Sequence, residues 1–441
     1  MSSPTLLIPL GGVGNVNTNM YLYEYEGKIL IVDCGIGFPQ DGSSEYVYVP
    51  DISYLKGREH DIVAMVLTHG HDDHIAALPY IIPQLGNHFP IFAAPLTQGF
   101  TKDRVEDYEV TLNFEPLPRA PHQVGPFTIH GVAVTHSVPD TFHVVITTPT
   151  GTIYHGSDFK FDLNPIDGVL PDFQEMSRVG REGVMLLLSD SLNSEVETFS
   201  ESESTLTDMF RREMNNVGGK ILVTVMSSNI HRIQQVLNIA NEVGRKVVFV
   251  GRSVEQNVKT ALDLGYLHAK ENSILPKHRL NKLHPHQVCV VIAGSQGQEQ
   301  SSLSRAAQGI HKLVTIEPQD KVIFASEAIP GNEHNVYGAI DMLARTGADV
   351  TYYDIDTSVH VSGHSSALEQ KLLIAMTKPK HLTPIGGNYR HMIQYRSLAR
   401  SLGYRDDKIH LLDNGMVVSV TPEEVKVINT LELQQMSVTN Q

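Results

Sequence analysis

The alternation of hydrophobic and polar residues predicts a run of short strands in the first part of the chain. Leu6–Leu10, Met20–Tyr25 and Lys28–Asp33 are apolar or alternating segments that glycine-containing turns separate. This pattern is typical of a β meander. Further strands are predicted at Asp61–Thr68, Pro90–Ala93, Phe127–Val134, His143–Thr147, Thr152–Tyr154 and Val184–Leu188.

The hydrophobic period changes after Ser200. Ser202 is a plausible N-cap for a helix that starts there, and helices then alternate with aliphatic strands. Such alternation predicts a separate α/β domain with parallel strands from about Glu203 to Asp354. The strands predicted in this domain are Lys220–Val225, Lys246–Val250, Val288–Ile292 and Val322–Ala325, and its helices are predicted over 230–243 and 254–264.

The polar tail from Leu431 to Gln441 is expected to be frayed.

Composition describes a globular chain and limits its surroundings. The 441 residues are 41% hydrophobic and 19% charged, which suits two or three domains. No apolar stretch approaches the roughly 20 residues of a membrane span, and the N-terminus lacks a signal-peptide pattern. We therefore expect a cytoplasmic protein with no membrane partner. Cys34 and Cys289 are expected to be packed thiols. The net charge of −15 argues against a general polyanion-coating surface, although a deep site with bound cations could still hold phosphates.

The run His69-Gly70-His71-Asp72-Asp73-His74 carries the strongest chemical signal. It follows a predicted buried strand and precedes an apolar helix that begins near Ile75. Two histidines separated by one residue at a strand end can chelate one ion, and the following Asp73 and His74 can face a second. Imidazoles and carboxylates without a thiolate favour zinc or manganese in a catalytic site. The alternative is a histidine-rich surface turn.

Two later segments can extend this site. His136 follows a predicted strand and would complete three imidazoles on one metal. Asp158 also follows a strand and could bridge two ions with one carboxylate. Taken alone, each residue could equally be an ordinary solvated or turn residue. Their combination with the run at residues 69–74 favours metal binding.

A possible acid or charge-stabilising pair comes from Asp190 and His364. Asp190 lies at a predicted strand end, and a carboxylate can fix the tautomer of a histidine and raise its basicity. A buried structural pair is the alternative. Gly363, Ser365 and the amides at the start of a helix from Leu368 are also predicted to suit a phosphate.

Several independent segments resemble one family. The chain resembles metallo-β-lactamase-fold proteins with an inserted beta-CASP domain, and among them the bacterial ribonuclease J family. The resemblance covers nearly the whole chain. Besides the metal motif, it rests on Gly35–Pro39, Val49–Leu55, Gly156–Asp162, Ser189–Glu195, Ser228–Arg232, Gly294–Gly297 and Ile329–Glu333.

The resemblance implies an α/β fold, a metallo-β-lactamase αββα sandwich with an inserted beta-CASP α/β domain. It places the sandwich at residues 1–202 and 355–430, the beta-CASP domain at 203–354 and a flexible tail at 431–441. The family usually continues into a small C-terminal domain that supports dimerisation. Because the sequence stops at Gln441, that domain is predicted to be absent, which leaves a homo-oligomer or a partner nuclease open.

The function that the resemblance implies is a metal-dependent ribonuclease. It would hydrolyse phosphodiester bonds of single-stranded RNA through a metal-activated hydroxide, as a 5′-to-3′ exonuclease, an endonuclease or both. Two zinc ions are expected, with manganese or magnesium possible: His69, His71 and His136 on one, Asp73 and His74 on the other, and Asp158 between them. Asp73, Asp190 and His364 are the implied catalytic residues. The implied substrate contacts are His360, Val361, Ser362, Gly363 and His364, with Ser228, Asn229, His231 and Ser295 as weaker candidates.

One position departs from the family. Gly386, in the segment Pro384–Arg390, stands where the family carries a histidine ligand of the second metal. Glycine supplies no ligand, so the second site is predicted to be weakened. A degenerate paralogue that binds RNA or a partner without cutting is therefore the alternative function. A hydrolase that acts on another ester or on DNA is a further alternative, which the inserted domain disfavours.

Overall fold

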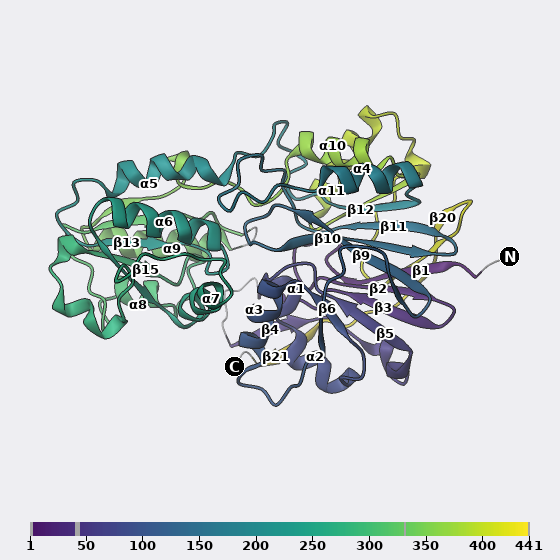
Figure 1. Cartoon of the computed structure of the whole chain (residues 1–441), viewed down its shortest axis with the longest axis horizontal. Coiled ribbons are helices and arrows are strands. Elements are labelled where there is room, and N and C mark those ends of the chain that lie inside the picture. The colour runs from purple at the N-terminus through teal and green to yellow at the C-terminus, as the bar shows by residue number, and fades with distance from the viewer. Residues whose placement is uncertain (1–2, 40–44, 330–331, 440–441) are drawn as a thin grey trace.

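The computed structural model describes residues 3–39, 45–329 and 332–439, and two facing β-sheets form its larger part (Figure 1). The first sheet has eight strands in the order β20-β19-β1-β2-β3-β5-β6-β7. Its strands are β20 (Val425–Thr430), β19 (Met416–Val420), β1 (Thr5–Gly11), β2 (Met20–Tyr25), β3 (Lys28–Val32), β5 (Ile62–Val66), β6 (Ile91–Ala93) and β7 (Phe114–Pro116).

The second sheet of the sandwich has six strands in the order β18-β12-β11-β10-β9-β8. They are β18 (His381–Ile385), β12 (Leu186–Asp190), β11 (Gly151–Gly156), β10 (Thr141–Thr148), β9 (Phe127–Val134) and β8 (His122–Val124). Side chains on the inner faces, such as Leu30, Val66, Val144 and Leu188, form one buried cluster between the two sheets. Side chains alternate along a strand, so the intervening residues point to the outer faces. Ile31, Met65 and Leu187 make these faces apolar as well, and they need covering.

Helices cover both outer faces of the sandwich (Figure 1). On the eight-stranded sheet, Ile31 and Met65 share a buried cluster with Leu78 and Phe100 of the covering helices. On the six-stranded sheet, Leu187 packs with Leu373 in the same way. The first group is α1 (Asp72–Ile75), α2 (Leu78–Leu85) and α3 (Pro95–Val105), and the second is α4 (Phe173–Glu182), α10 (Ala367–Thr377) and α11 (Tyr389–Ser401). These layers confirm the predicted αββα sandwich.

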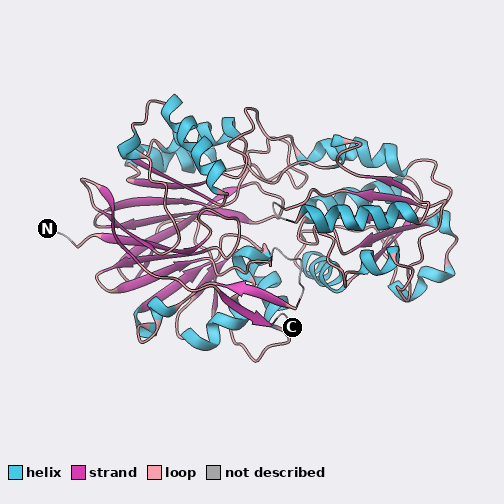
Figure 2. Ribbon diagram, turned by 180° about the vertical axis from the view of Figure 1, so that it is seen from behind, coloured by secondary structure: helices cyan, strands magenta, loops and turns pink. Residues whose placement is uncertain are grey.

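A second α/β unit lies beside the sandwich (Figure 2). Its five strands are all parallel, in the order β14-β15-β13-β16-β17, as the alternation of strands and helices predicted. The strands are β14 (Lys246–Val250), β15 (Val288–Ile292), β13 (Ile221–Thr224), β16 (Lys321–Phe324) and β17 (Asp349–Thr351). The helices are α5 (Leu206–Met214), α6 (Ile230–Glu242), α7 (Arg252–Asp263), α8 (Ser302–Ala307) and α9 (Glu333–Arg345). The predicted boundaries at residues 203 and 354 stay a prediction.

The second unit is inserted between two strands that are neighbours in the six-stranded sheet. β12 and β18 pair in parallel, with Asp190 opposite Ile385, although the whole inserted unit separates them in sequence. β11 pairs in parallel with β12 as well, with Gly156 opposite Ser189. The carboxyl ends of three parallel strands therefore meet at one edge of the sandwich, and the loops that follow them lie next to the inserted unit.

The C-terminal tail differs from the expectation of fraying. Met436–Thr439 forms strand β21, which pairs antiparallel with β4 (Tyr46–Val49) and sets Val438 opposite Val47. Val438 also packs against the large core cluster, which explains why the segment is ordered. Residues 440–441 lie outside the described part of the chain. Among the described helices, none has the length and apolarity that crossing a membrane requires.

Short 3-10 helices complete the described elements. Ser202 accepts a hydrogen bond from the amide of Ser204 at the start of one of them, as its predicted role as a cap requires. They are η1 (Ser53–Leu55), η2 (Glu59–Asp61), η3 (Glu203–Thr205), η4 (Lys277–Lys282), η5 (Pro285–Gln287), η6 (Thr357–Val359) and η7 (Asp406–Lys408). Cys34 and Cys289 are buried free thiols, as predicted.

Candidate metal centre

The histidine run lies where β5 ends and α1 begins. The loop after β3 supports it, because the amide of Cys34 donates to the carbonyl of His74 at 2.8 Å and the amide of Ile36 donates to the carbonyl of Asp72. Gly35 permits this approach. A Cβ atom at Gly35 would lie 1.5 Å from the carbonyl oxygen of Asp73, so a residue with a side chain would displace the run.

Three imidazole nitrogens converge on one point. The Nε2 atom of His69 and the Nε2 atom of His136 each lie 3.1 Å from the Nδ1 atom of His71. Ligands at the usual zinc–nitrogen distance in a tetrahedral site are separated by roughly 3.3 Å. Burial lowers the pKa of all three imidazoles, that of His71 to about 4, so their lone pairs are free at neutral pH. The spacing and the chemistry both suit one zinc-sized cation.

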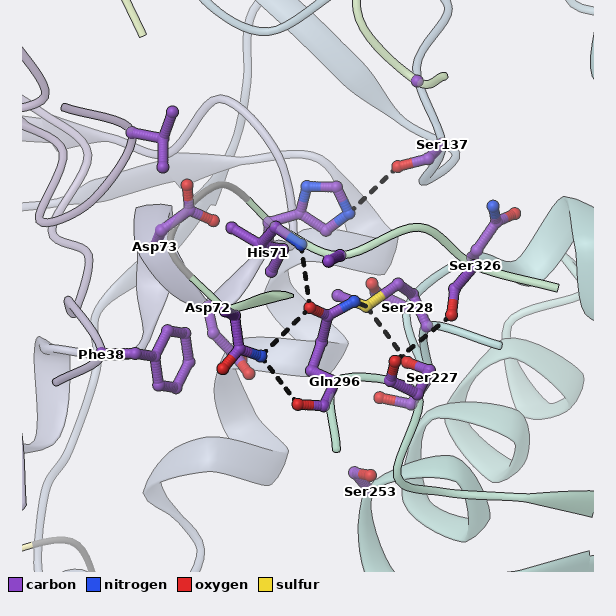
Figure 3. A pocket seen from close by; sticks show the side chains of 18 of the residues that line it. Phe38, His71, Asp72, Asp73, Ser137, Ser227, Ser228, Ser253, Gln296 and Ser326 are labelled. Atoms are coloured by element: carbon purple, nitrogen blue, oxygen red, sulfur yellow. Dashed lines mark hydrogen bonds between the residues drawn. The ribbon is translucent and has the colours of Figure 1, made fainter. Parts of the chain in front are cut away.

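The second nitrogen of each ring fixes its tautomer. Thr68 Oγ1 donates its proton to Asp33 at 2.9 Å, so it accepts from Nδ1–H of His69 at 3.0 Å. His136 donates Nδ1–H to the carbonyl of Gly363 at 2.6 Å. His71 likewise has its Nε2 atom 3.2 Å from Ser137 Oγ (Figure 3). His69 and His136 therefore keep their protons on the outer nitrogen and offer the inner one to a cation, and Ser137 can accept a proton from the outer nitrogen of His71 in the same way.

A second cluster shares one carboxylate with the first. Asp158 Oδ2 lies 3.7 Å from His69 Nε2 and 3.8 Å from His136 Nε2, and it lies 3.5 Å from His74 Nε2. Asp73 Oδ2 is also 3.5 Å from the same nitrogen of His74. Asp73, His74 and Asp158 can thus hold a second cation, with Asp158 as the bridge that the sequence predicted.

Charge in this second cluster also favours a cation. Burial lowers the pKa of His74, but the carboxylates of Asp73, Asp158 and Asp33 outweigh it and raise that pKa. Burial raises the pKa of Asp158, but the rings of His74 and His364 outweigh it and hold that pKa well below its usual range. Buried carboxylates gathered around one imidazole are stable only when positive charge compensates them. A divalent ion would supply that charge.

The second cluster is open on the side of Gly386. This residue follows β18 with φ of +64°, and a Cβ atom there would lie 3.6 Å from Asp158 Oδ1 and 3.5 Å from Asp190 Oδ1. A side chain at this position would start beside the carboxylate of Asp158. Among the described residues, the second cluster has three candidate ligands and the first has four.

His364 and Asp190 lie beside the shared carboxylate. His364 donates Nδ1–H to Asp190 Oδ2 at 2.8 Å, and its Nε2 atom is 3.9 Å from Asp158 Oδ2. Burial lowers the pKa of His364, but the carboxylates of Asp190 and Asp158 raise it to about 9. The amide of Leu192 donates to the other oxygen of Asp190, which holds the carboxylate in place. The pair is arranged to present one nitrogen of His364 to the centre.

The centre opens into a cavity of about 1050 Å³ at the junction between the sandwich and the inserted unit. In Figure 3, His71, Asp72 and Asp73 lie on one side of the cavity, and Gln296, Ser227 and Ser228 face them from the inserted unit. The structure brings most of the predicted substrate contacts to this cavity. His360, Val361, Ser362, Gly363, His364, Ser228, Asn229 and Ser295 line it.

Two sequence expectations do not match the structure. His231 is not among the residues that line the cavity, because its Nε2 atom contacts Asp167 Oδ2 at 3.1 Å. The amides at the start of α10 are also not free for a phosphate. Those of Ala367 and Leu368 donate to the carbonyls of Val196 and Thr198.

Sequence reasoning missed Asp33. This fully buried residue accepts hydrogen bonds from His74 Nδ1 at 2.7 Å, from the hydroxyl of Thr68 and from the amide of Thr68. It therefore orients a residue of each cluster, His74 directly and His69 through Thr68. A carboxylate directly after the apolar strand β3 was the available signal, because Asp158 and Asp190 lie at strand ends in the same way.

Models of two protein families match different parts of the chain. The model of the metallo-beta-lactamase superfamily matches residues 13–161, and that of the ribonuclease J beta-CASP domain matches residues 218–343. Ribonuclease J of Thermus thermophilus is 38% identical over 426 residues, which cover 95% of this chain and 74% of that protein. The chain belongs to the ribonuclease J family.

Other members of the ribonuclease J family match over nearly the whole chain. Ribonuclease J of Helicobacter pylori strain B128 is 35% identical over 440 residues, 99% of this chain, and this chain spans 63% of its length. A crystal structure of a protein of unknown function from Enterococcus faecalis V583 shares the fold. It has a TM-score of 0.64 at 14% identity and covers 95% of this chain and 100% of its own.

Replacing Asp33 with asparagine is expected to weaken metal binding although Asp33 contacts no cation. An amide cannot provide the charge and the acceptors that hold His74 and Thr68, so we expect affinity to fall about tenfold to hundredfold. Chelator competition with zinc and manganese measures it. Asp61→Asn is the control, because Asp61 pairs with Lys28 at the surface. Unchanged affinity in Asp33→Asn would contradict this role.

Proposed function

We propose that this chain is a metal-dependent ribonuclease that hydrolyses phosphodiester bonds of single-stranded RNA, as a 5′-to-3′ exonuclease, an endonuclease or both. The observation that carries the proposal is the pair of ligand clusters that share Asp158 Oδ2 in the cavity. The names of the relatives, ribonuclease J throughout, support RNA as the substrate.

The two clusters would hold two divalent cations. His69, His71 and His136 would bind one, Asp73 and His74 the other, and Asp158 would bridge them. When bound, such a pair supplies Lewis acidity, which activates water and neutralises charge on a scissile phosphate. The ligands themselves are held rigidly by their outer hydrogen bonds, so the cations would need little rearrangement of the protein.

His364 is the proposed proton donor to the leaving 3′ oxygen. Asp190 occupies its Nδ1 atom, so only Nε2 can serve the substrate, and this nitrogen faces the bridging carboxylate. A phosphate that contacts both cations would therefore lie within reach of His364. General acid catalysis of this kind contributes about a hundredfold to ten-thousandfold in rate.

The donor atoms favour different metals at the two positions. Three imidazoles and one carboxylate suit zinc at the first. Two carboxylates and one imidazole, open beside Gly386, form a harder and more oxygen-rich set that also admits manganese or magnesium with water as further ligands. We propose zinc at the first position and zinc, manganese or magnesium at the second.

The cavity suits a polymer despite the net charge of −15. Its volume of about 1050 Å³ is slightly above the roughly 300–1,000 Å³ range of small-molecule pockets. Arg104, Arg252, Arg305 and Arg390 also contribute to its walls, three of them in ion pairs with Asp72, Asp107 and Glu195. Local cations of this kind can attract a phosphate although the surface as a whole is acidic.

An RNA-binding protein without nuclease activity is the second candidate function. Gly386 favours it, because the second cluster has no ligand on that side. Metal content and decay of 5′-monophosphorylated RNA, measured on the same sample, separate the two candidates. Decay in the wild type with zinc, manganese or magnesium supports the ribonuclease. Decay only after Gly386→His supports the second candidate, and RNA that is neither bound nor cut contradicts both.

Gly386→His is expected to tighten the second metal about tenfold, a lower bound set by the effect of outer partners. Its side chain would start beside Asp158, and histidine is among the residues that tolerate a positive φ best. Chelator competition measures the affinity. Gly386→Ala is the matched control, since it imposes the same backbone strain without a ligand. An equal affinity in both variants would show that position 386 does not reach the metal.

A further inference from the structure

Arg232 of α6 is a buried cation whose donors are all used. Its side chain is 2% exposed, and Nε and Nη2 each donate to one carboxylate oxygen of Glu203 at 2.8 Å. Nη1 donates to the carbonyl of Ala325 at 2.9 Å and to Nδ1 of His360 at 3.0 Å, and Nη2 also donates to the carbonyl of Val361 at 3.1 Å. These acceptors account for every N–H of the guanidinium.

The acceptors of Arg232 come from both crossings between the sandwich and the inserted unit. Glu203 lies on the segment that enters the inserted unit, and His360 and Val361 lie on the segment that returns to the sandwich. Ala325 follows β16 inside the inserted unit. One side chain therefore joins the inserted unit to both connecting segments, just before the return segment reaches the metal centre at His364.

The return segment is held by its carbonyl groups. Four consecutive carbonyls accept hydrogen bonds from side chains of the protein, so the backbone cannot rotate freely. The pairs are Val361 with Arg232, Ser362 with Lys160 Nζ (3.1 Å), Gly363 with His136 Nδ1 (2.6 Å) and His364 with Ser200 Oγ (2.7 Å).

Three backbone amides of the same segment are free to bind a ligand. Within the described part of the chain, the N–H groups of Val361, Ser362 and Gly363 have no hydrogen-bond partner. All three residues line the cavity beside the metal centre. Consecutive free amides can form a concave anion site, and the hydrogen bonds to the carbonyls of this segment hold its backbone in place.

Arg232 also fixes the tautomer of His360. A guanidinium can only donate, so Nδ1 of His360 must accept and its proton must be on Nε2. Burial, with Arg232 and Lys160 nearby, lowers the pKa of His360 well below its usual value, which agrees with a neutral ring. His360 lines the cavity. Its Nε2–H is therefore a further donor at the cavity, 3.8 Å from the carboxylate of Glu327.

We propose that Arg232 is a positioning residue for phosphate recognition by this site. Anchored by Glu203, Arg232 holds the ring of His360 and the carbonyl of Val361 so that the free amides and the Nε2–H of His360 donate to one phosphate of the substrate. This inference rests on the proposed function, since it assigns the phosphate to an RNA substrate. It adds a residue that does not touch the substrate and that couples the inserted unit to the metal centre.

Arg232→Lys tests the proposal, with Arg245→Lys as its matched control. Arg245 is also buried in the inserted unit and donates to the carbonyls of Gly219 and Val288, away from the cavity. Lysine keeps the charge but lacks the fork that binds Glu203 and His360 together. We expect KM for a short 5′-monophosphorylated RNA to rise about tenfold or more in Arg232→Lys, because charge-assisted phosphate contacts are lost. Metal content should stay unchanged.

A spectroscopic readout separates positioning from simple stabilisation. In protein labelled with ¹⁵N-histidine, and assigned with His360→Gln, the ring of His360 should show an unprotonated Nδ1 in the wild type and in Arg245→Lys. In Arg232→Lys the ¹⁵N resonance of Nδ1 should shift, because Nδ1 loses the hydrogen bond that Nη1 of Arg232 donates. If Arg232→Lys does not fold, Glu203→Gln weakens the ion pair between Arg232 and Glu203 and should also raise KM.

The outcomes are decisive in both directions. Equal changes of KM in Arg232→Lys and Arg245→Lys, in proportion to their loss of Tm, would overturn the proposal. A protonated Nδ1 of His360 in the wild type would overturn it as well. If the wild type does not cleave RNA, the proposed function fails on its own. The tautomer signature and titration with inorganic phosphate then still test the role of Arg232.

Discussion

Asp158→Asn is expected to release the metals of both clusters and to abolish RNA hydrolysis. Asp158 Oδ2 lies within 3.8 Å of the ligand nitrogens of His69, His74 and His136. Asparagine keeps the shape but removes the negative charge that two cations share. Since the loss of an outer partner already costs about tenfold to hundredfold in affinity, loss of the bridge should cost at least about a hundredfold at each position. Metal analysis after dialysis, together with decay of labelled RNA, measures both effects.

Asp162→Asn is the control for this experiment. Asp162 lies in the same loop and is as buried as Asp158, but it accepts hydrogen bonds from the amides of Glu203 and Asn164 and is in neither cluster. The Asp162→Asn variant should be less stable than the wild type and should keep both metals. Asp73→Asn should lose only the second metal, because Asp73 belongs to one cluster. Retention of both metals by Asp158→Asn would refute the bridging role.

The sequence predicted those parts of the fold that depend on local pattern. Strand β5, with its apolar residues before the histidine run, and four of the five strands of the inserted unit with helices α5, α6 and α7 follow from hydrophobic period. Strand β17 and helices α8 and α9 were not predicted individually. The arrangement of these elements came from the resemblance, because no local pattern shows that β12 and β18 are neighbours on either side of the inserted unit. Strand β21 was missed for the same reason, since its partner β4 is distant in sequence.

In the candidate site, too, local motifs could be predicted from the sequence and contacts between distant segments could not. His69, His71, Asp73 and His74 form one continuous motif, so their proximity needs only a strand end and a turn. Hydrogen bonds between distant backbone segments cannot be read from a motif. The start of α10 resembled an anion site in the sequence, but carbonyls of the loop at residues 196–198 already occupy its first amides.

The orienting residues were the hardest to predict. Asp33 and Arg232 contact no cation in the proposed scheme, and neither belongs to a recognisable metal spacing. Their roles follow from hydrogen-bond direction: a hydroxyl proton used on Asp33, and a guanidinium that can only donate to His360. Such arguments need coordinates. Arg232 and Lys160, two buried cations, both act on carbonyls of the segment before His364.

His364→Ala is expected to lower kcat by about a hundredfold to ten-thousandfold while both metals stay bound. Only Nε2 of His364 is free to serve the substrate, because Asp190 holds Nδ1–H at 2.8 Å. If His364 protonates the leaving oxygen, its removal should matter most for a poor leaving group such as the 3′ oxygen of ribose. Single-turnover cleavage of RNA under metal saturation measures the effect on the chemical step.

A substrate with a good leaving group distinguishes proton donation from a merely structural role for His364. Hydrolysis of bis(p-nitrophenyl) phosphate releases nitrophenolate, which needs no proton from the protein. We therefore expect His364→Ala to slow this substrate far less than it slows RNA, and Asp190→Asn to show the same selectivity in weaker form. An equal loss on both substrates would instead show that His364 organises the centre, because damage to metal geometry slows every phosphodiester alike.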